Sequence, residues 1–262
     1  MKAGLGAGRT PTAWYIVPSD NYLARWANTL HLPYTAWHCS YAALGAGMAY
    51  YVRWDVLGWA VLAFFLGMGV AAHCFDLLKG DPLALRIPFY HLLLVGAVSL
   101  VAAMAIGALN IAWGNVAWWW AFAIAAGWLI ALGYNLEWPG MHGDAQFSLF
   151  WGAFPALVGY FAMGGGLAET GGIIPGIFAA LFATLTAWGQ RVLSTRARFL
   201  RRKVEVLDGY YSFDAHANGS TGRGRHGIDK QWILEPLDRA LMLFSFAMPI
   251  LAVGVLLWRR GW

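Results

Sequence analysis

Residues 73–86 place several ionisable side chains directly after a long apolar run. If the helix continues through residue 80, His73, Asp76 and Gly80 share one face, and Lys79 follows Asp76 at i+3. An ionisable residue at the edge of a membrane span is costly, which makes Asp76 a candidate functional residue and metal ligand. The alternative interpretation is an interfacial ion pair of Asp76 with Lys79, whose stem reaches back to water.

Two more polar stretches follow apolar runs. Residues 134–144, YNLEWPGMHGD, contribute Glu137 and Asp144. Residues 189–203, GQRVLSTRARFLRRK, form a basic stripe at helical spacing. Guanidinium groups suit phosphate because they donate two parallel hydrogen bonds. The same arginines also suit anionic lipid headgroups, or serve membrane topology alone. The stripe consists of Arg191, Ser194, Thr195, Arg198 and Arg202.

Two His-Cys pairs, at residues 38–39 and 73–74, invite a metal hypothesis. Adjacent positions on a helix point about 100° apart, so four convergent ligands are hard to assemble from two such pairs. Ordinary buried packing is the simpler interpretation for both cysteines.

The elements that position these residues are predicted to be membrane helices. The chain of 262 residues is 60% hydrophobic and 12% charged, with a mean hydropathy of +0.53. Each charge-free window is long enough for one span, and window 87–136 is long enough for two, with a break at residues 110–115. We therefore predict an all-α polytopic membrane protein with about seven spans. The windows are 26–52, 56–75, 87–136, 145–168, 170–190 and 240–258.

The distribution of positive charge predicts the topology. With the N-terminus inside the inner or plasma membrane, every Lys and Arg except Arg53, Arg259 and Arg260 falls on the cytoplasmic side, and the C-terminus lies opposite. We expect an N-terminal cytoplasmic segment with an interfacial helix (1–32), a six-helix core (33–200), a cytoplasmic loop (201–235) and a last span (236–262). In the loop we expect a hairpin around Asp208–Gly209, and a flexible glycine-rich loop at 218–227.

All three polar stretches then open to the cytoplasm, which predicts a polar cavity at that end of an apolar bundle. Such a bundle suits an amphiphile with a charged head and a hydrocarbon tail, such as an isoprenoid diphosphate. No nucleic-acid motif is found.

Residues 23–203 resemble the UbiA-type intramembrane prenyltransferases, closest to the menaquinone-forming branch. LHLPYTAWHCSYAALGAGMA resembles the opening helix, and AHCFDLLKGDPLALRIP lies where the family carries its first motif, Asn-Asp-x-x-Asp-x-x-x-Asp. Asp76 matches the third polar position, whereas Ala72, His73 and Gly80 stand where Asn, Asp and Asp are expected. YNLEWPGMHGDAQFSLFWGAFPALVGYFAMGGG resembles a later region, in which Gly143–Asp144 match a Gly-Glu pair.

The resemblance implies a helical bundle that uses Mg²⁺ to hold a prenyl diphosphate and transfers the prenyl group to an aromatic or lipid acceptor. The second aspartate motif is missing, because AWGQRVLSTRARFLRR contains no acid. A terpene cyclase, or a subunit that only binds an isoprenoid, quinone or pigment, therefore remains an alternative. The implied partners are an isoprenoid diphosphate and membrane lipids, with a place in a larger membrane complex as a further option.

The implied roles fall into three groups. Asp76, with His73 or Glu137 as base, would be catalytic. The metal ligands would be Asp76, Asp81 and Asp144, with Glu137 able to join them. The diphosphate would be held by Lys79, Arg86, Asn135, Gln190, Arg191 and Arg198.

Overall fold

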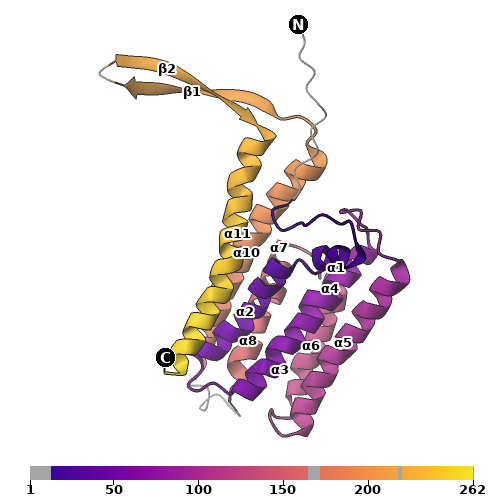
Figure 1. Ribbon diagram of the computed structural model, residues 1–262. Helices are drawn as coiled ribbons and strands as arrows, with labels where there is room; N and C mark the ends of the chain where they lie inside the picture. The colour runs from indigo at the N-terminus through magenta and orange to yellow at the C-terminus, as the bar shows by residue number, and fades with distance from the viewer. Residues whose placement is uncertain (1–12, 165–171, 218–219, 262) are drawn as a thin grey trace.

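The computed structural model describes residues 13–164, 172–217 and 220–261, and most of them are helical. Helices stand side by side in a bundle, and two long helices, α10 and α11, project from it to a β-hairpin (Figure 1). The bounds are α1 (Tyr22–Leu30), α2 (Leu32–Met48), α3 (Trp54–Phe64), η1 (Phe65–Ala71), α4 (Ala72–Leu78), α5 (Phe89–Ala112), α6 (Trp120–Asn135), α7 (Asp144–Ser148), η2 (Leu149–Ala153), α8 (Phe154–Phe161), α10 (Ile174–Lys203), β1 (Asp208–Ala217), β2 (Ser220–Asp229) and α11 (Lys230–Arg259).

Four helices of the described chain are long and apolar enough to cross a membrane. They are Trp54–Leu78, Phe89–Ala112, Ile174–Lys203 and Lys230–Arg259. The first combines α3, the π-helical η1 and α4. These helices support the expected helical membrane protein. The predicted break in window 87–136 is confirmed: α5 ends at Ala112, Gly114 has a φ of 72°, and α6 begins at Trp120.

Helix α2 forms the centre of the bundle and is buried over most of its length. It packs backbone to backbone on α8 through two small pairs. A Cβ atom on Gly45 would overlap the carbonyl oxygen of Ala156, and one on Gly159 would overlap that of Ala42. A helix that is apolar all round is expected in such a buried position. Small residues at the interface allow the two backbones this close approach.

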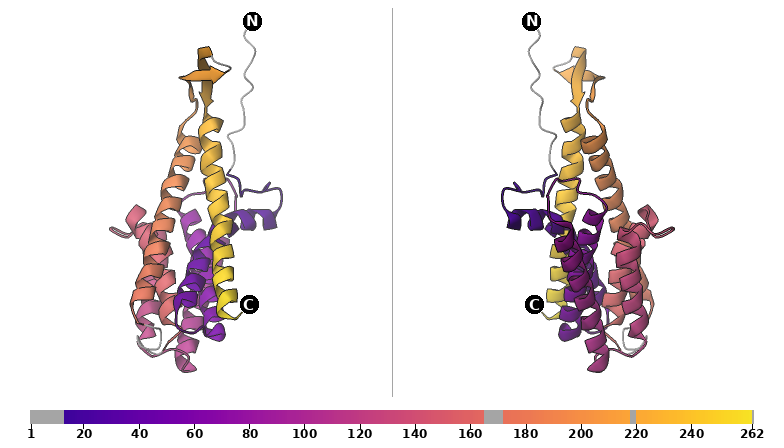
Figure 2. Two further views of the ribbon diagram at one scale, coloured as in Figure 1. Left: turned by 90° about the vertical axis from the view of Figure 1, so that its left-hand side faces the viewer. Right: turned by 90° about the vertical axis from the view of Figure 1, so that its right-hand side faces the viewer.

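The short helix α1 lies crosswise at the end of the bundle nearest the hairpin (Figure 2). Asn21 caps it by accepting from the Ala24 N–H at 2.8 Å. His31, with a left-handed φ of 43°, separates α1 from α2. A helix therefore lies within residues 1–32, and its interfacial position stays a prediction.

The hairpin differs from the prediction in register. Asp208 and Gly209 pair with Asp229 and Ile228 at its base, so the turn expected there is wrong. The prediction of a flexible loop over the glycine-rich stretch is also wrong, because this stretch forms β2 from Ser220. Residues 204–207, expected to be the first strand, are not a strand, and residues 210–213 pair instead with residues of β2. Residues 218 and 219 lie outside the described part.

Polar contacts join α10 and α11 below the hairpin. Arg201 and Asp238 form a half-buried ion pair, and the Lys230 Nζ donates to the Val204 carbonyl at 2.9 Å. Asp229 caps α11 by accepting from the Trp232 N–H at 2.7 Å. These contacts fix the hairpin as a continuation of the two helices, and α11 ends at the opposite end of the bundle (Figure 1).

Candidate functional site

Polar side chains from four segments converge at the hairpin end of the bundle. The rings of His31 and His73 meet edge to face with centroids 4.9 Å apart. Asp76 lies within electrostatic range of His73, Arg198 and Tyr134. We call the polar cluster the set formed by His31, His73, Asp76, Tyr134, Arg191 and Arg198.

Burial and neighbouring groups determine how the two histidines of the cluster hold protons. The pKa of His31 is lowered well below its usual value, chiefly by burial, and further by His73, Arg198 and Arg202. The His73 Nδ1 lies 2.9 Å from the Gly69 carbonyl oxygen, so Nδ1 carries the hydrogen and the other ring nitrogen can accept a proton.

The Arg191 guanidinium is fixed in place by two contacts. Its Nε donates to the Asp144 Oδ1 at 2.9 Å, and its guanidinium lies 5.5 Å from the centre of the Phe147 ring. The side chain of Arg191 is only 15% exposed, whereas that of Asp144 is 55% exposed. Asp76 and Arg198 are also exposed. The cluster is therefore anchored on α10 and accessible from solvent.

The acids predicted to share a magnesium ion have separate partners. Asp81 accepts from the backbone N–H groups of Leu85 at 2.9 Å and Arg86 at 2.7 Å. Glu137 lies 3.9 Å from Lys79, and Asp144 binds Arg191.

Within residues 13–164, 172–217 and 220–261, no group of three or more His, Cys, Asp or Glu side chains is placed to hold a metal ion. The donor set does not fit the predicted magnesium site, which needs several oxygen ligands around one ion. No such group forms around the His-Cys pairs in the described ranges either. Cys39 and Cys74 are buried free thiols.

The predicted diphosphate ligands are only partly brought together. Arg191 and Arg198 belong to the cluster, and Lys79 pairs with Glu137 in place of the alternative partner Asp76. The Asn135 Nδ2 donates to the Ala131 carbonyl of its own helix at 2.7 Å, and Gln190 is buried below the cluster. Arg86 is exposed and follows α4 in a loop, with a φ of 55°.

An aromatic layer adjoins the cluster, and Tyr134 belongs to both. The Tyr134 ring packs on Trp151, with centroids 4.5 Å apart, and the His38 Nδ1 lies 3.0 Å from the Trp151 carbonyl oxygen. Sequence reasoning missed Trp151, Phe147 and the role of Tyr134, because aromatic residues are frequent throughout the chain. The quoted YNLE stretch was the one signal that pointed to Tyr134.

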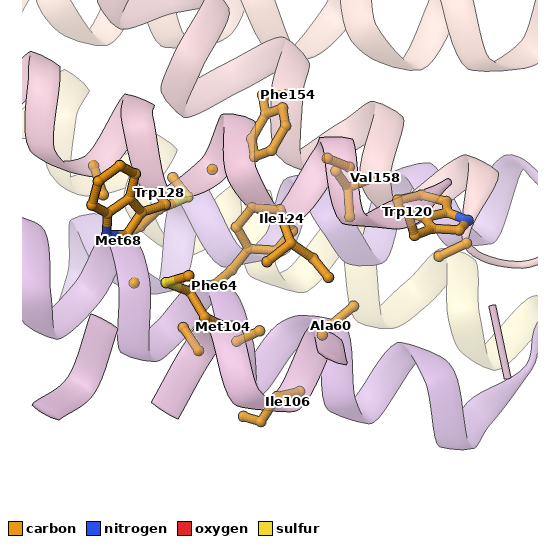
Figure 3. A pocket seen from close by; sticks show the side chains of 18 of the residues that line it. Ala60, Phe64, Met68, Met104, Ile106, Trp120, Ile124, Trp128, Phe154 and Val158 are labelled. Carbon is orange, nitrogen blue, oxygen red and sulfur yellow. The ribbon is translucent and has the colours of Figure 1, made fainter. Parts of the chain in front are cut away.

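An apolar cavity of about 150 Å³ begins on the other side of this layer (Figure 3). It is bounded by α3, η1, α5, α6, η2 and α8, and Trp151 lines it. Labelled side chains such as Phe64, Ile124 and Val158 surround it in the close view. The π-helical segments η1 and η2 both contribute to its wall, and such segments are frequent at functional sites.

Comparison of the chain with protein-family models, curated proteins and solved structures gives no match. Its function is therefore inferred from the residues themselves.

Proposed function

We propose that this chain is an integral membrane protein that binds an isoprenoid diphosphate and transfers its prenyl group to a lipid-soluble acceptor. One observation carries the proposal: the basic polar cluster lies next to an apolar cavity, with Trp151 touching both. A ligand that fills both must have an anionic head and a hydrocarbon tail.

The head would lie against Arg191 and Arg198. Both guanidinium groups donate hydrogen bonds that match phosphate oxygens, and Asp144 holds the first of them in place. Because Arg191 is largely desolvated, its interaction with a phosphate oxygen is stronger than that of an exposed arginine. Two cations at the diphosphate would also stabilise pyrophosphate as it leaves.

The tail would enter the apolar cavity. Along α3 and η1 the cavity wall runs from Val56 to Met68, which is about 18 Å of helix. The cavity is comparable in volume to an engineered one of about 150 Å³ that binds benzene, so it encloses only part of a long chain. The rest would pass out beside Trp59 and Trp128, which are 37% and 38% exposed.

Transfer requires breaking the C–O bond of the diphosphate, forming a bond to the acceptor and removing a proton from the acceptor. His73 suits the last step, because its second nitrogen is free to accept while Nδ1 is bound to Gly69. Glu137 is the weaker candidate base, since Lys79 lies beside it.

The membrane arrangement is part of the proposal. Helices α2 and α6 and the stretch from α7 to α8 would be three further spans, giving seven. The hairpin and the polar cluster would face the cytoplasm, and the C-terminus would lie on the opposite side.

A second function, binding without turnover, has an observation of its own in its favour. The acidic side chains that the resemblance assigns to magnesium are not gathered among the described residues. The same head and tail sites would then hold an isoprenoid, quinone or pigment that stays intact.

The deciding experiment is pyrophosphate release by the purified protein from geranylgeranyl diphosphate. A transferase releases pyrophosphate only with an acceptor extract, a cyclase releases it without one, and a binding protein releases none. We expect acceptor-dependent release that Asp76→Asn and the pair Arg191→Gln with Arg198→Gln abolish. Arg196→Gln, on the same helix and exposed, is the matched control and should keep the activity. Binding without any release would reject transfer in favour of the second function.

A further inference from the structure

Two buried polar atoms, one in the polar cluster and one next to it, have no hydrogen-bond partner in the described part of the chain. They are the Tyr134 Oη and the Gln190 Oε1. Tyr134 is 6% exposed and Gln190 is 4% exposed. Buried polar groups are nearly always satisfied by protein, water or ligand, so both atoms indicate that something else binds here.

Both residues belong to one small region around Phe147. The ring centroid of Phe147 lies 6.0 Å from that of Tyr134 and 5.4 Å from that of His38. Arg191, the neighbour of Gln190, has its guanidinium 5.5 Å from the same ring. Both side chains therefore lie beside one group of aromatic rings, next to Arg191.

The hydrogen-bonding chemistry of this region follows from His38. Its Nδ1 lies 3.0 Å from the Trp151 carbonyl oxygen, which can only accept, so Nδ1 carries the hydrogen. The second ring nitrogen is then an acceptor, and the Gln190 side chain lies within hydrogen-bonding range of His38. The Gln190 Oε1 has no hydrogen-bond donor in the described part of the chain.

An unpartnered acceptor requires a ligand with an O–H or N–H group. A deprotonated phosphate oxygen has no hydrogen to donate, so the diphosphate satisfies the arginines but not the Gln190 Oε1. Tyr134 can donate to the same ligand group, and the rings of Phe147, Tyr134 and Trp151 can pack against an aromatic or apolar body.

We infer that Tyr134 and Gln190 form a subsite that recognises a hydroxyl or amino group of a neutral second ligand. Its assignment as the acceptor of prenyl transfer rests on the proposed function. The two residues orient that ligand under the diphosphate, and they are specificity-determining residues rather than catalytic ones.

The test uses a matched pair of probes, phenol and anisole, which differ in the single O–H hydrogen. Equilibrium dialysis against purified protein in detergent should show saturable binding of phenol and at least tenfold weaker binding of anisole. Tyr134→Phe and Gln190→Leu should each weaken phenol binding at least fivefold. Tyr134→Phe removes only an unpartnered atom, so this variant should unfold at the same temperature as the wild type or higher, whereas Gln190→Leu also removes the amide beside His38.

Ser194→Ala is the control, because its hydroxyl donates to the Arg191 carbonyl of its own helix, at 3.2 Å. Phenol binding that is absent, or equal in wild type, Tyr134→Phe and Gln190→Leu, would overturn the subsite and leave a buried water as the partner of both atoms. Failure of the proposed function looks different: saturable phenol binding would persist while no pyrophosphate is released from any diphosphate.

Discussion

Replacement of Gly159 by valine should break one of the two close backbone contacts between α2 and α8. A Cβ atom at this position would overlap the carbonyl oxygen of Ala42, which is backbone of the central helix α2 and cannot rotate away. Helices α2 and α8 must therefore separate. Overpacking of a well-packed core costs typically 1–3 kcal/mol, and because backbone must move here we expect a loss of about 3 kcal/mol in the free energy of unfolding.

The assay is unfolding of the purified protein in mixed micelles by increasing denaturing detergent. Gly58→Ala is the matched control: Gly58 lies in α3 with no atom within 4 Å of an added Cβ. That change should stabilise the helix by about 0.5–1 kcal/mol, because alanine is the better helix former. Equal unfolding midpoints for Gly159→Val and Gly58→Ala would refute the packing of α2 on α8.

Three further predictions follow from other parts of the chain. The pKa of His31 is lowered in the folded protein, whereas the unfolded chain binds a proton near pH 6.5, so the free energy of unfolding should fall as the pH drops below about 6.5 toward the folded pKa. The variant His31→Asn, in which asparagine tolerates the left-handed φ, should reduce this dependence of stability on pH, measured as unfolding curves between pH 8 and 5. An unchanged pH dependence would contradict the burial of the His31 ring. Asp238→Asn should lower the free energy of unfolding by about 2 kcal/mol in the same assay, because its ion pair with Arg201 is half-buried. Glu235→Gln, which breaks an exposed ion pair, should lower it by no more than about 0.5 kcal/mol. Equal losses would rule out that the Arg201–Asp238 pair holds α10 and α11 together. Ser212→Cys in the hairpin should react with an impermeant maleimide only in inside-out vesicles and Trp118→Cys only in right-side-out vesicles, and the reverse pattern would invert the proposed topology.

Much of the helical architecture was predictable from the sequence, because charge-free windows of about twenty residues have few alternatives to helix. The break between α5 and α6 was predictable for a different reason: residues 110–115 contain Asn and Gly in a run without charge. The hairpin register was not predictable, because Asp208–Gly209 is a strong turn signal. In the structure these residues lie in a strand and pair with Asp229 and Ile228. Cross-strand pairing over ten residues outweighed local turn preference.

The candidate site was predictable only in part. Charged residues such as Asp76 and Arg191 stand out in an apolar chain and could be named as candidates. Their partners were not predictable, since the pairing of Arg191 with Asp144 depends on how α10 packs against α7. The buried residues Gln190 and Tyr134 carry no charge, so their lack of partners is visible only in the structure.

The central claim is that the polar cluster binds a phosphorylated head, and the affinity for geranylgeranyl diphosphate tests it most directly. Each charged hydrogen bond contributes about 1.5–3 kcal/mol. We therefore predict that Arg191→Gln with Arg198→Gln weakens binding at least a hundredfold, and that Arg196→Gln weakens it less than threefold. Equal dissociation constants for the two variants, or no binding to the wild type, would contradict the claim.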